Sequence, residues 1–230
     1  MRAVVFDWDG TLVDTLPAIL RANVEVLAEY GVSFDETMYR TAYVPDWRHM
    51  YRTLGVPESE IGAAGTRWLE LYRAVDGLAP FPGVVEAIHR LADTGHRMGL
   101  VTAGDRFIVE AQLARFGLDG LLSVQVCGDD PFPAKPDPAP LRHALEALRA
   151  DALPEGPIYV GDAPDDMRMA RTLGVRGVGI VGPLATSDDL RQAGASETAV
   201  SVVAWVEAYL APRAGEAGAS PAGRARTRQP

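Results

Sequence analysis

Short apolar runs that alternate with helical patterns are the feature that most constrains the fold of this 230-residue chain. Each run is bounded by turn-forming or charged residues, which is typical of strands buried on both faces of a parallel sheet. The runs span 3–7, 98–102, 123–127, 157–161 and 177–181. Helical spacing of apolar residues predicts helices at about 84–92, 108–116, 141–149 and 165–173. The alternation predicts an α/β fold with a doubly wound parallel sheet.

The stretch from about 15 to 80 interrupts this alternation, because it has helical periodicities but no convincing buried strand. We therefore expect a small helical cap, 15–80, inserted after the first strand of a core that consists of 1–14 and 81–210. Turn-forming residues predict the hinges of this cap at Asp14–Pro17 and Pro80–Gly83.

The end of the chain, 211–230, has few large apolar residues and is rich in Ala, Gly, Arg and Pro. It cannot bury enough apolar surface to order itself, so we expect a disordered basic tail. A solvated tail is favoured over an arm that binds nucleic acid or an acidic partner. The whole chain carries 31 acidic and 22 basic residues, a net charge of −9. Such an acidic protein repels polyphosphate backbones, so nucleic acid is not an expected partner.

The distribution of apolar residues predicts no membrane partner. No apolar run in the sequence approaches the roughly 18 residues of a membrane span, and the apolar start, 1–6, is too short for a signal peptide. Cys127 is the only cysteine in the sequence, so no internal disulfide can form, as is usual in the reducing cytoplasm. We expect a cytoplasmic protein, and the sequence leaves its oligomeric state open.

Two groups of carboxylates stand at the ends of predicted strands. Asp7 and Asp9 are two residues apart where the first strand ends, so both can face one pocket. Asp162 and Asp166 follow the fourth strand. Because the carboxyl ends of the strands form the ligand crevice of a doubly wound sheet, the two groups are expected to converge. Clustered carboxylates repel unless a cation lies among them, and oxygen ligands favour Mg²⁺.

Two further residues suit an anionic phosphoryl group beside such an ion. Thr102 ends the second predicted strand, and Lys135, the only lysine of the sequence, lies between the acidic groups. A hydroxyl and an ammonium group can hold phosphoryl oxygens and offset their charge. Each feature alone has a structural explanation, such as a turn at Asp9 or a helix cap at Asp162. Their order and their positions at strand ends favour a common phosphoryl-binding site.

With these motifs the chain resembles the haloacid dehalogenase-like hydrolase superfamily, and its phosphoglycolate phosphatase-like branch in particular. Residues 7–11 (DWDGT) are similar to the first motif of the family, Thr102 to the second, Lys135 to the third, and Asp162 with Asp166 to the fourth. The resemblance extends up to the tail and includes the position of the cap. It implies a Rossmann-like core and a Mg²⁺-dependent phosphatase for a small phosphorylated metabolite.

The resemblance also implies a role for each motif residue. Asp7 is expected to attack phosphorus and form an aspartyl-phosphate, whereas Asp9 protonates the leaving oxygen and then activates water. Asp7 must then be ionised while Asp9 holds a proton. The implied Mg²⁺ ligands are Asp7, the backbone carbonyl of Asp9, Asp162 and Asp166, and the implied phosphate-binding residues are Thr102 and Lys135.

Trp8 departs from the family pattern, because an aliphatic residue is usual between the two aspartates. Its side chain is expected to point away from the carboxylates and to affect packing. The residues after Thr102, Ala103-Gly104-Asp105, also depart from it, because many relatives have Asn or Ser there. The side-chain contacts of the family are therefore not expected here, whereas the backbone amides remain available.

Other reactions are possible on this kind of fold. Dehalogenation is disfavoured because Asp9 supplies a leaving-group acid, and phosphonatase chemistry because the cap has no lysine. A sugar-phosphate mutase of the β-phosphoglucomutase type is left as an alternative, since cap arginines could grip a sugar. These arginines are Arg40, Arg48, Arg52 and Arg67. A receiver-like signalling module is disfavoured by the order of the motifs, and a non-catalytic binding protein by the presence of every motif position.

Overall fold

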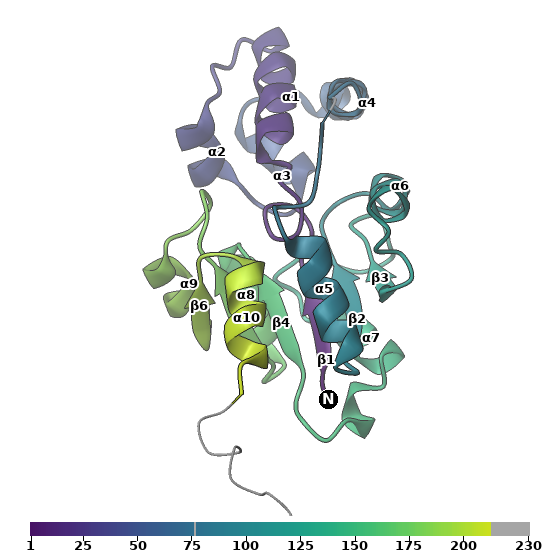
Figure 1. Cartoon of the computed structure of the whole chain (residues 1–230). Helices are drawn as coiled ribbons and strands as arrows, with labels where there is room; N and C mark the ends of the chain where they lie inside the picture. The colour runs from purple at the N-terminus through teal and green to yellow at the C-terminus, as the bar shows by residue number, and fades with distance from the viewer. Residues whose placement is uncertain (76, 213–230) are drawn as a thin grey trace, which may run out of the picture.

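The structure is a computed structural model that describes residues 1–75 and 77–212. The predicted tail, 211–230, lies outside the described residues from 213 onward. Figure 1 shows a sheet flanked by helices in the lower part of the molecule and a group of helices above it. Within the described ranges, no helix is long and apolar enough to cross a membrane.

The sheet has six parallel strands in the order β3-β2-β1-β4-β5-β6. The strands are β1 (Ala3–Phe6), β2 (Arg97–Val101), β3 (Leu122–Val126), β4 (Ile158–Gly161), β5 (Arg176–Ile180) and β6 (Glu197–Ala199). The doubly wound sheet and the five predicted strands are confirmed. β6 was not predicted, because it is short and only partly buried. The strand order reverses between β1 and β4, where doubly wound sheets bind their ligands.

Helices cover both faces of the sheet because the side chains of β1 alternate between them. Val4 and Phe6 pack with α5 (Val84–Asp93), α6 (Arg106–Phe116) and α10 (Val202–Leu210). Ala3 and Val5 pack on the other face with α7 (Ala139–Ala147), α8 (Pro164–Thr172) and α9 (Ser187–Ala193). Two short 3₁₀ helices lie at Glu58–Glu60 and Ala150–Ala152. The four predicted helices correspond to α5, α6, α7 and α8 with small shifts of their ends.

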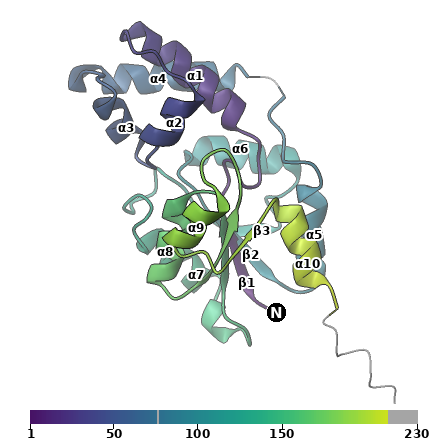
Figure 2. The ribbon, with the colours of Figure 1, turned by 90° about the vertical axis from the view of Figure 1, so that its left-hand side faces the viewer.

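Four helices follow β1 in the chain, and we call this segment, residues 16–73, the helical insertion. They are α1 (Leu16–Glu29), α2 (Glu36–Ala42), α3 (Trp47–Thr53) and α4 (Ile61–Arg73). Asp35 and Asp46 cap α2 and α3 by accepting hydrogen bonds from backbone N–H groups of the first turn. The insertion has its own apolar cluster, which includes Val26, Leu27 and Ile61. Figure 2 shows it above the carboxyl end of the sheet.

Candidate active site

The loop after β1 turns sharply and lies beside the loop after β4. Gly10 has a φ of 75°, a left-handed conformation that favours glycine. A Cβ atom at this position would also overlap the carboxylate of Asp162. Val13 forms isolated bridges with Asp9 and with Pro80, so it ties the loop to the segment that leads into α5. Glycine at position 10 therefore permits both the turn and the close approach of Asp162.

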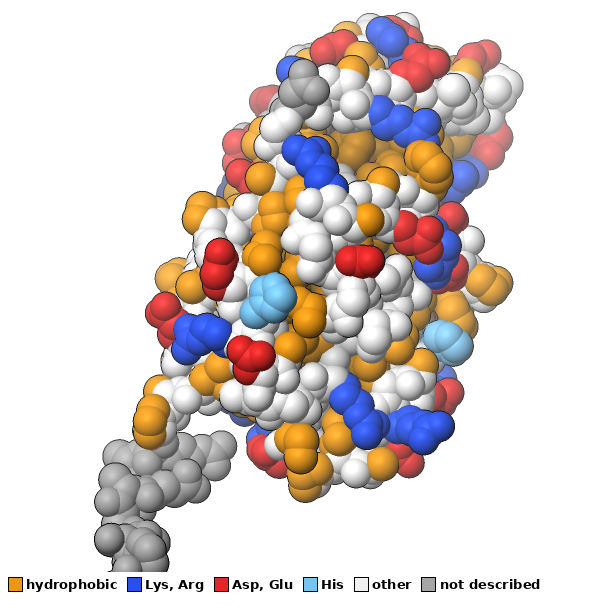
Figure 3. Space-filling model, turned by 45° about the vertical axis from the view of Figure 1, so that its right-hand side comes forward, with side chains coloured by type: hydrophobic (Ala, Val, Ile, Leu, Met, Phe, Trp, Pro, Cys, Tyr) orange, Lys and Arg blue, Asp and Glu red, His pale blue; other side chains and the backbone are white. Residues whose placement is uncertain are grey.

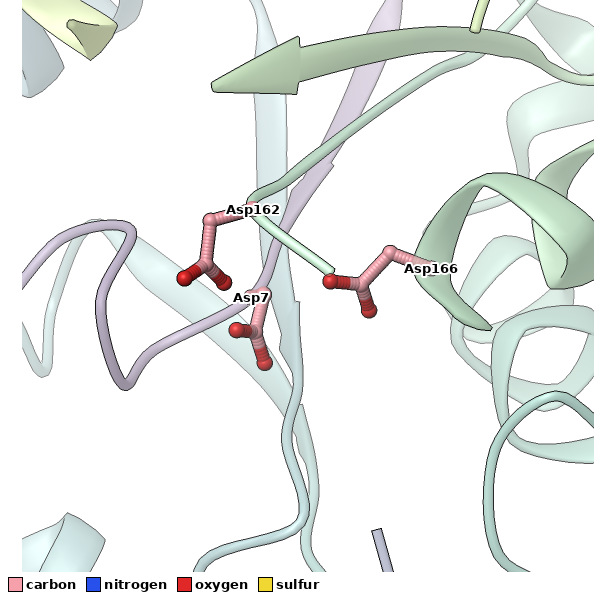
Figure 4. A group of neighbouring side chains, drawn as sticks. All are labelled: Asp7, Asp162 and Asp166. Carbon is pink, nitrogen blue, oxygen red and sulfur yellow. The ribbon is translucent and has the colours of Figure 1, made fainter. Parts of the chain in front are cut away.

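Three carboxylates meet at the switch point of the sheet. Asp7 comes from the end of β1, Asp162 from the end of β4, and Asp166 from the first turn of α8 (Figure 4). One carboxylate oxygen of each lies within 4.8 Å of the other two, and all three side chains are buried. Asp166 is held in place by the Tyr159 hydroxyl, which donates over 2.9 Å, and by the backbone N–H of Ala163, which donates over 3.1 Å.

Lys135 is the buried cation of this group. It lies in the loop between β3 and α7, and its Nζ is 2.6 Å from Asp7 Oδ1 and 2.8 Å from Asp166 Oδ1. The attraction within a buried ion pair offsets the lost hydration of its charges only when the charged groups lie close together in good hydrogen-bond geometry. The ammonium group therefore offsets part of the negative charge that the three carboxylates bring together.

Asp9 and Thr102 lie close to this group but are arranged differently. In the described part of the chain, the close group of three carboxylates does not include Asp9, whose carboxylate lies beside Gly104 and lines a cavity. Thr102 is buried, and its Oγ1 accepts a hydrogen bond from the backbone N–H of Gly104 over 3.0 Å. Asp7 and Asp9, the two acids of the first motif, therefore have different surroundings. Asp7 lies among the other carboxylates, and Asp9 lies at the cavity.

Two residues in the site were not predicted. The Thr11 hydroxyl lies 3.2 Å from Asp162 Oδ1 and 3.4 Å from Asp7 Oδ2, so it can donate to either carboxylate. Tyr159, which lies in β4, donates a hydrogen bond from its hydroxyl to Asp166. Thr11 could have been predicted, because it belongs to the DWDGT motif. Tyr159 could not, because it looks like any other large residue of a buried strand, and only its hydroxyl group is polar.

The surroundings shift the pKa values of these groups. Burial raises the pKa of Asp7 from 3.8 to about 7; Lys135 opposes this shift, while Asp166 and Asp9 add to it. Burial, together with the charges of Asp7 and Asp166, raises the pKa of Asp162 well above its usual range. Burial lowers the pKa of Lys135, but the two carboxylates that it contacts outweigh burial and raise it overall. Burial also raises the pKa of Asp9. Close carboxylates thus retain protons unless further positive charge is supplied.

A cavity of about 360 Å³ lies between the helical insertion and the carboxyl end of the sheet. Asp9, Gly104 and Asp105 line it from the sheet side, and mainly aromatic and aliphatic side chains line it from the insertion. Figure 3 shows one side of the molecule, with hydrophobic side chains inside a hollow in its upper half and basic side chains beside this hollow. Trp8 is fully buried, and its Nε1 donates to Gln112 Oε1 over 2.6 Å.

The four arginines of the helical insertion that could bind a sugar occupy different places. Arg48 lines the cavity. Arg52 forms an exposed ion pair with Glu58, and Arg67 forms ion pairs with Glu29 and Glu70. The fourth, Arg40, lines a separate hollow at the loop before α9. Only Arg48 of these four is therefore placed to meet a molecule in the cavity.

Comparison with known proteins agrees with this fold. Residues 4–180 match the haloacid dehalogenase-like hydrolase family. A phosphoglycolate phosphatase of Cupriavidus necator is 35% identical over 181 residues, covering 75% of this chain and 78% of the relative. One from Xylella fastidiosa is 32% identical, covering 76% and 77%. The structure of CbbY from Rhodobacter sphaeroides in complex with phosphate is 27% identical, with a TM-score of 0.73, and covers 88% of this chain and 96% of that one. The chain belongs to the haloacid dehalogenase-like hydrolase family, in the branch that contains these phosphoglycolate phosphatases.

Proposed function

We propose that this protein is a Mg²⁺-dependent phosphatase that hydrolyses a small phosphomonoester through an aspartyl-phosphate on Asp7. The observation that carries the proposal is the buried group of Asp7, Asp162 and Asp166 beside Lys135, at the ligand-binding edge of the sheet. The similarity of the chain to phosphoglycolate phosphatases supports the same reaction class. The single cysteine of the sequence is in keeping with a cytoplasmic location.

The three carboxylates fit a hard divalent cation. Their oxygens converge to within 4.8 Å. Burial raises the pKa values of Asp7 and Asp162, and the neighbouring carboxylates add to the shift, so an additional positive charge would favour their ionised forms. Asp7, Asp162 and Asp166, with the backbone carbonyl of Asp9, would hold Mg²⁺. When bound, Mg²⁺ supplies positive charge that keeps Asp7 ionised and offsets the charge of the phosphoryl oxygens.

The two acids of the first motif have surroundings that suit two different roles. The Asp7 carboxylate attacks phosphorus; a bond from its oxygen to phosphorus forms as the bond from phosphorus to the leaving oxygen breaks. The Asp9 carboxyl, with its raised pKa and its position on the cavity, gives its proton to the leaving oxygen. Asp9 then takes a proton from the water that releases phosphate and restores Asp7. Lys135 and Thr102 hold the phosphoryl oxygens.

Mg²⁺ is expected to stabilise the protein more as the pH rises from about 4 to 7. Because the pKa of Asp7 is raised from 3.8 to about 7 by folding, this carboxyl holds a proton in the folded protein that it has lost in the unfolded chain in this window. The contribution of Asp7 to stability without metal therefore falls as the pH rises. Metal binding requires the deprotonated carboxylates, so the stabilisation by Mg²⁺ grows over the same window. Melting temperatures in MgCl₂ and in EDTA across this range measure both effects; a shift independent of pH would contradict them.

The reaction itself is tested with p-nitrophenyl phosphate. Phosphate release is expected in MgCl₂, to be lost on treatment with EDTA, and to return when Mg²⁺ is added back. Full activity in EDTA would contradict the proposed metal dependence. Supplying β-glucose 1-phosphate separates the phosphatase from a mutase, because free phosphate is the expected product and glucose 6-phosphate as the main product would favour the mutase.

A further inference from the structure

The lining of the cavity beside Asp9 indicates which kind of leaving group the substrate has. We propose, building on the phosphatase function above, that the substrate is a phosphomonoester whose leaving group carries an uncharged planar aromatic ring. A short anionic group such as the carboxylate of phosphoglycolate is disfavoured. Because Asp9 lines the cavity and is the proposed leaving-group acid, the leaving group occupies this cavity while the phosphate lies toward Asp7.

The size of the cavity suits a ring better than a short acid. Its volume of about 360 Å³ falls in the range of roughly 300–1,000 Å³ that is typical of pockets for drug-sized organic molecules. A leaving group as short as that of phosphoglycolate would leave most of this volume to water and most of the apolar wall exposed.

The wall is built from aromatic rings of the helical insertion. Trp68 and Tyr72 of α4 stack on each other with their centroids 4.8 Å apart. Trp47 and Tyr51 of α3 meet edge to face at 5.6 Å. All four residues line the cavity. Aromatic rings prefer offset-stacked or edge-to-face partners at such separations, so the cavity presents surfaces that a further ring can contact.

The two side-chain amides of the wall, Asn23 and Gln112, are already bonded to neighbouring side chains. Asn23 Oδ1 accepts a hydrogen bond from the Tyr51 hydroxyl over 2.8 Å. Gln112 accepts from Trp8 over 2.6 Å and donates to the Tyr72 hydroxyl over 3.3 Å. These amides therefore stabilise the wall, and a ligand would have to break their bonds to use them.

The charges on the wall oppose an anionic leaving group. Two acids, Asp9 and Asp105, and one base, Arg48, line the cavity in the described part of the chain. The Arg48 guanidinium lies 4.4 Å from the centroid of the Trp47 ring, and its charge also acts on Asp105, because it opposes the rise in the pKa of that carboxyl that burial causes. With Asp9 protonated as the leaving-group acid, a carboxylate in the cavity would meet the negative charge of Asp105 and a cation whose charge already acts on Asp105. A neutral ring is therefore the better match.

The test compares three phosphate esters of primary alcohols, so that the leaving oxygen is chemically alike in each. They are 2-naphthylmethyl phosphate, phosphoglycolate and ethyl phosphate. We expect kcat/KM for the naphthylmethyl ester to exceed that for phosphoglycolate at least about tenfold. An equal or higher value for phosphoglycolate overturns the inference. Absence of Mg²⁺-dependent hydrolysis of these esters and of p-nitrophenyl phosphate would instead overturn the phosphatase function on which the inference rests.

Two variants locate the preference in the cavity. Trp68→Ala is expected to lower the ratio of kcat/KM between the naphthylmethyl and ethyl esters at least about fivefold, and this ratio is independent of the fraction of the protein that folds. Arg48→Gln is expected to leave the ratio of the naphthylmethyl ester to phosphoglycolate at ten or higher, because Arg48 is not needed for a neutral ring. An unchanged ratio in Trp68→Ala, or loss of the ring preference in Arg48→Gln, would contradict the inference.

Discussion

Replacement of Asp7 by asparagine is expected to lower kcat for p-nitrophenyl phosphate at least about a thousandfold. The amide is nearly the same size as the carboxylate but is neutral and a poor nucleophile, so it cannot form the phosphorus–oxygen bond. It also removes one of the three carboxylates that meet at the switch point. Steady-state phosphate release by the purified variant measures the effect.

The control for this variant is Asp14→Asn. Asp14 is exposed and follows the same loop, but it lies outside the group of three carboxylates, so near-normal activity is expected. Mass spectrometry of acid-quenched protein during turnover adds a second readout. It should detect a phosphorylated peptide containing Asp7 in the normal protein and none in Asp7→Asn. Activity of Asp7→Asn equal to that of Asp14→Asn would rule out Asp7 as the nucleophile.

Replacement of Lys135 by methionine is expected to lower the free energy of unfolding by about 3–5 kcal/mol at neutral pH without metal. The change keeps most of the buried chain length but leaves Asp7 and Asp166 without the ammonium group that now contacts both. Without this cation the pKa of Asp7 rises further, since Lys135 now lowers it. Near neutral pH the folded variant therefore holds more protons on Asp7 than the folded native protein does, so the loss of stability shrinks as the pH falls.

Urea unfolding at neutral and at acidic pH, in EDTA, measures this loss. Arg168→Met is the matched control, because Arg168 forms an ion pair with Asp165 at the surface. Exposed pairs of this kind contribute less than about 1 kcal/mol. Lys135→Met should also lose phosphatase activity, and Mg²⁺ should restore part of its stability. If Lys135→Met were as stable as Arg168→Met at neutral pH, the three carboxylates would not depend on this cation.

Local patterns in the sequence were sufficient for most of the core. Four of the five predicted strands are almost wholly buried runs whose apolar character is visible without knowledge of their neighbours, as in Val4–Phe6. The fifth, β3, is buried only at its two ends. β6 was missed because Glu197–Ala199 is short and half-buried, so it shows no apolar run. α9 and α10 were also not predicted, although α10 contains a long apolar segment around Trp205. Strand position also predicted that Asp7 and Asp162 would meet, since parallel strands end at one edge.

The sequence by itself determined the fold class, the positions of the acids at strand ends and the resemblance to a hydrolase family, because each depends on residues close together in the chain. Only the tertiary structure decided that Asp9 faces the cavity while Asp7 faces the other acids. It also decided that Thr11 and Tyr159 bond the carboxylates, and that Arg48 alone of the four arginines considered borders the aromatic wall. These features depend on side-chain directions and on packing between the helical insertion and the sheet. Segments far apart in the chain create them, and no local pattern encodes them.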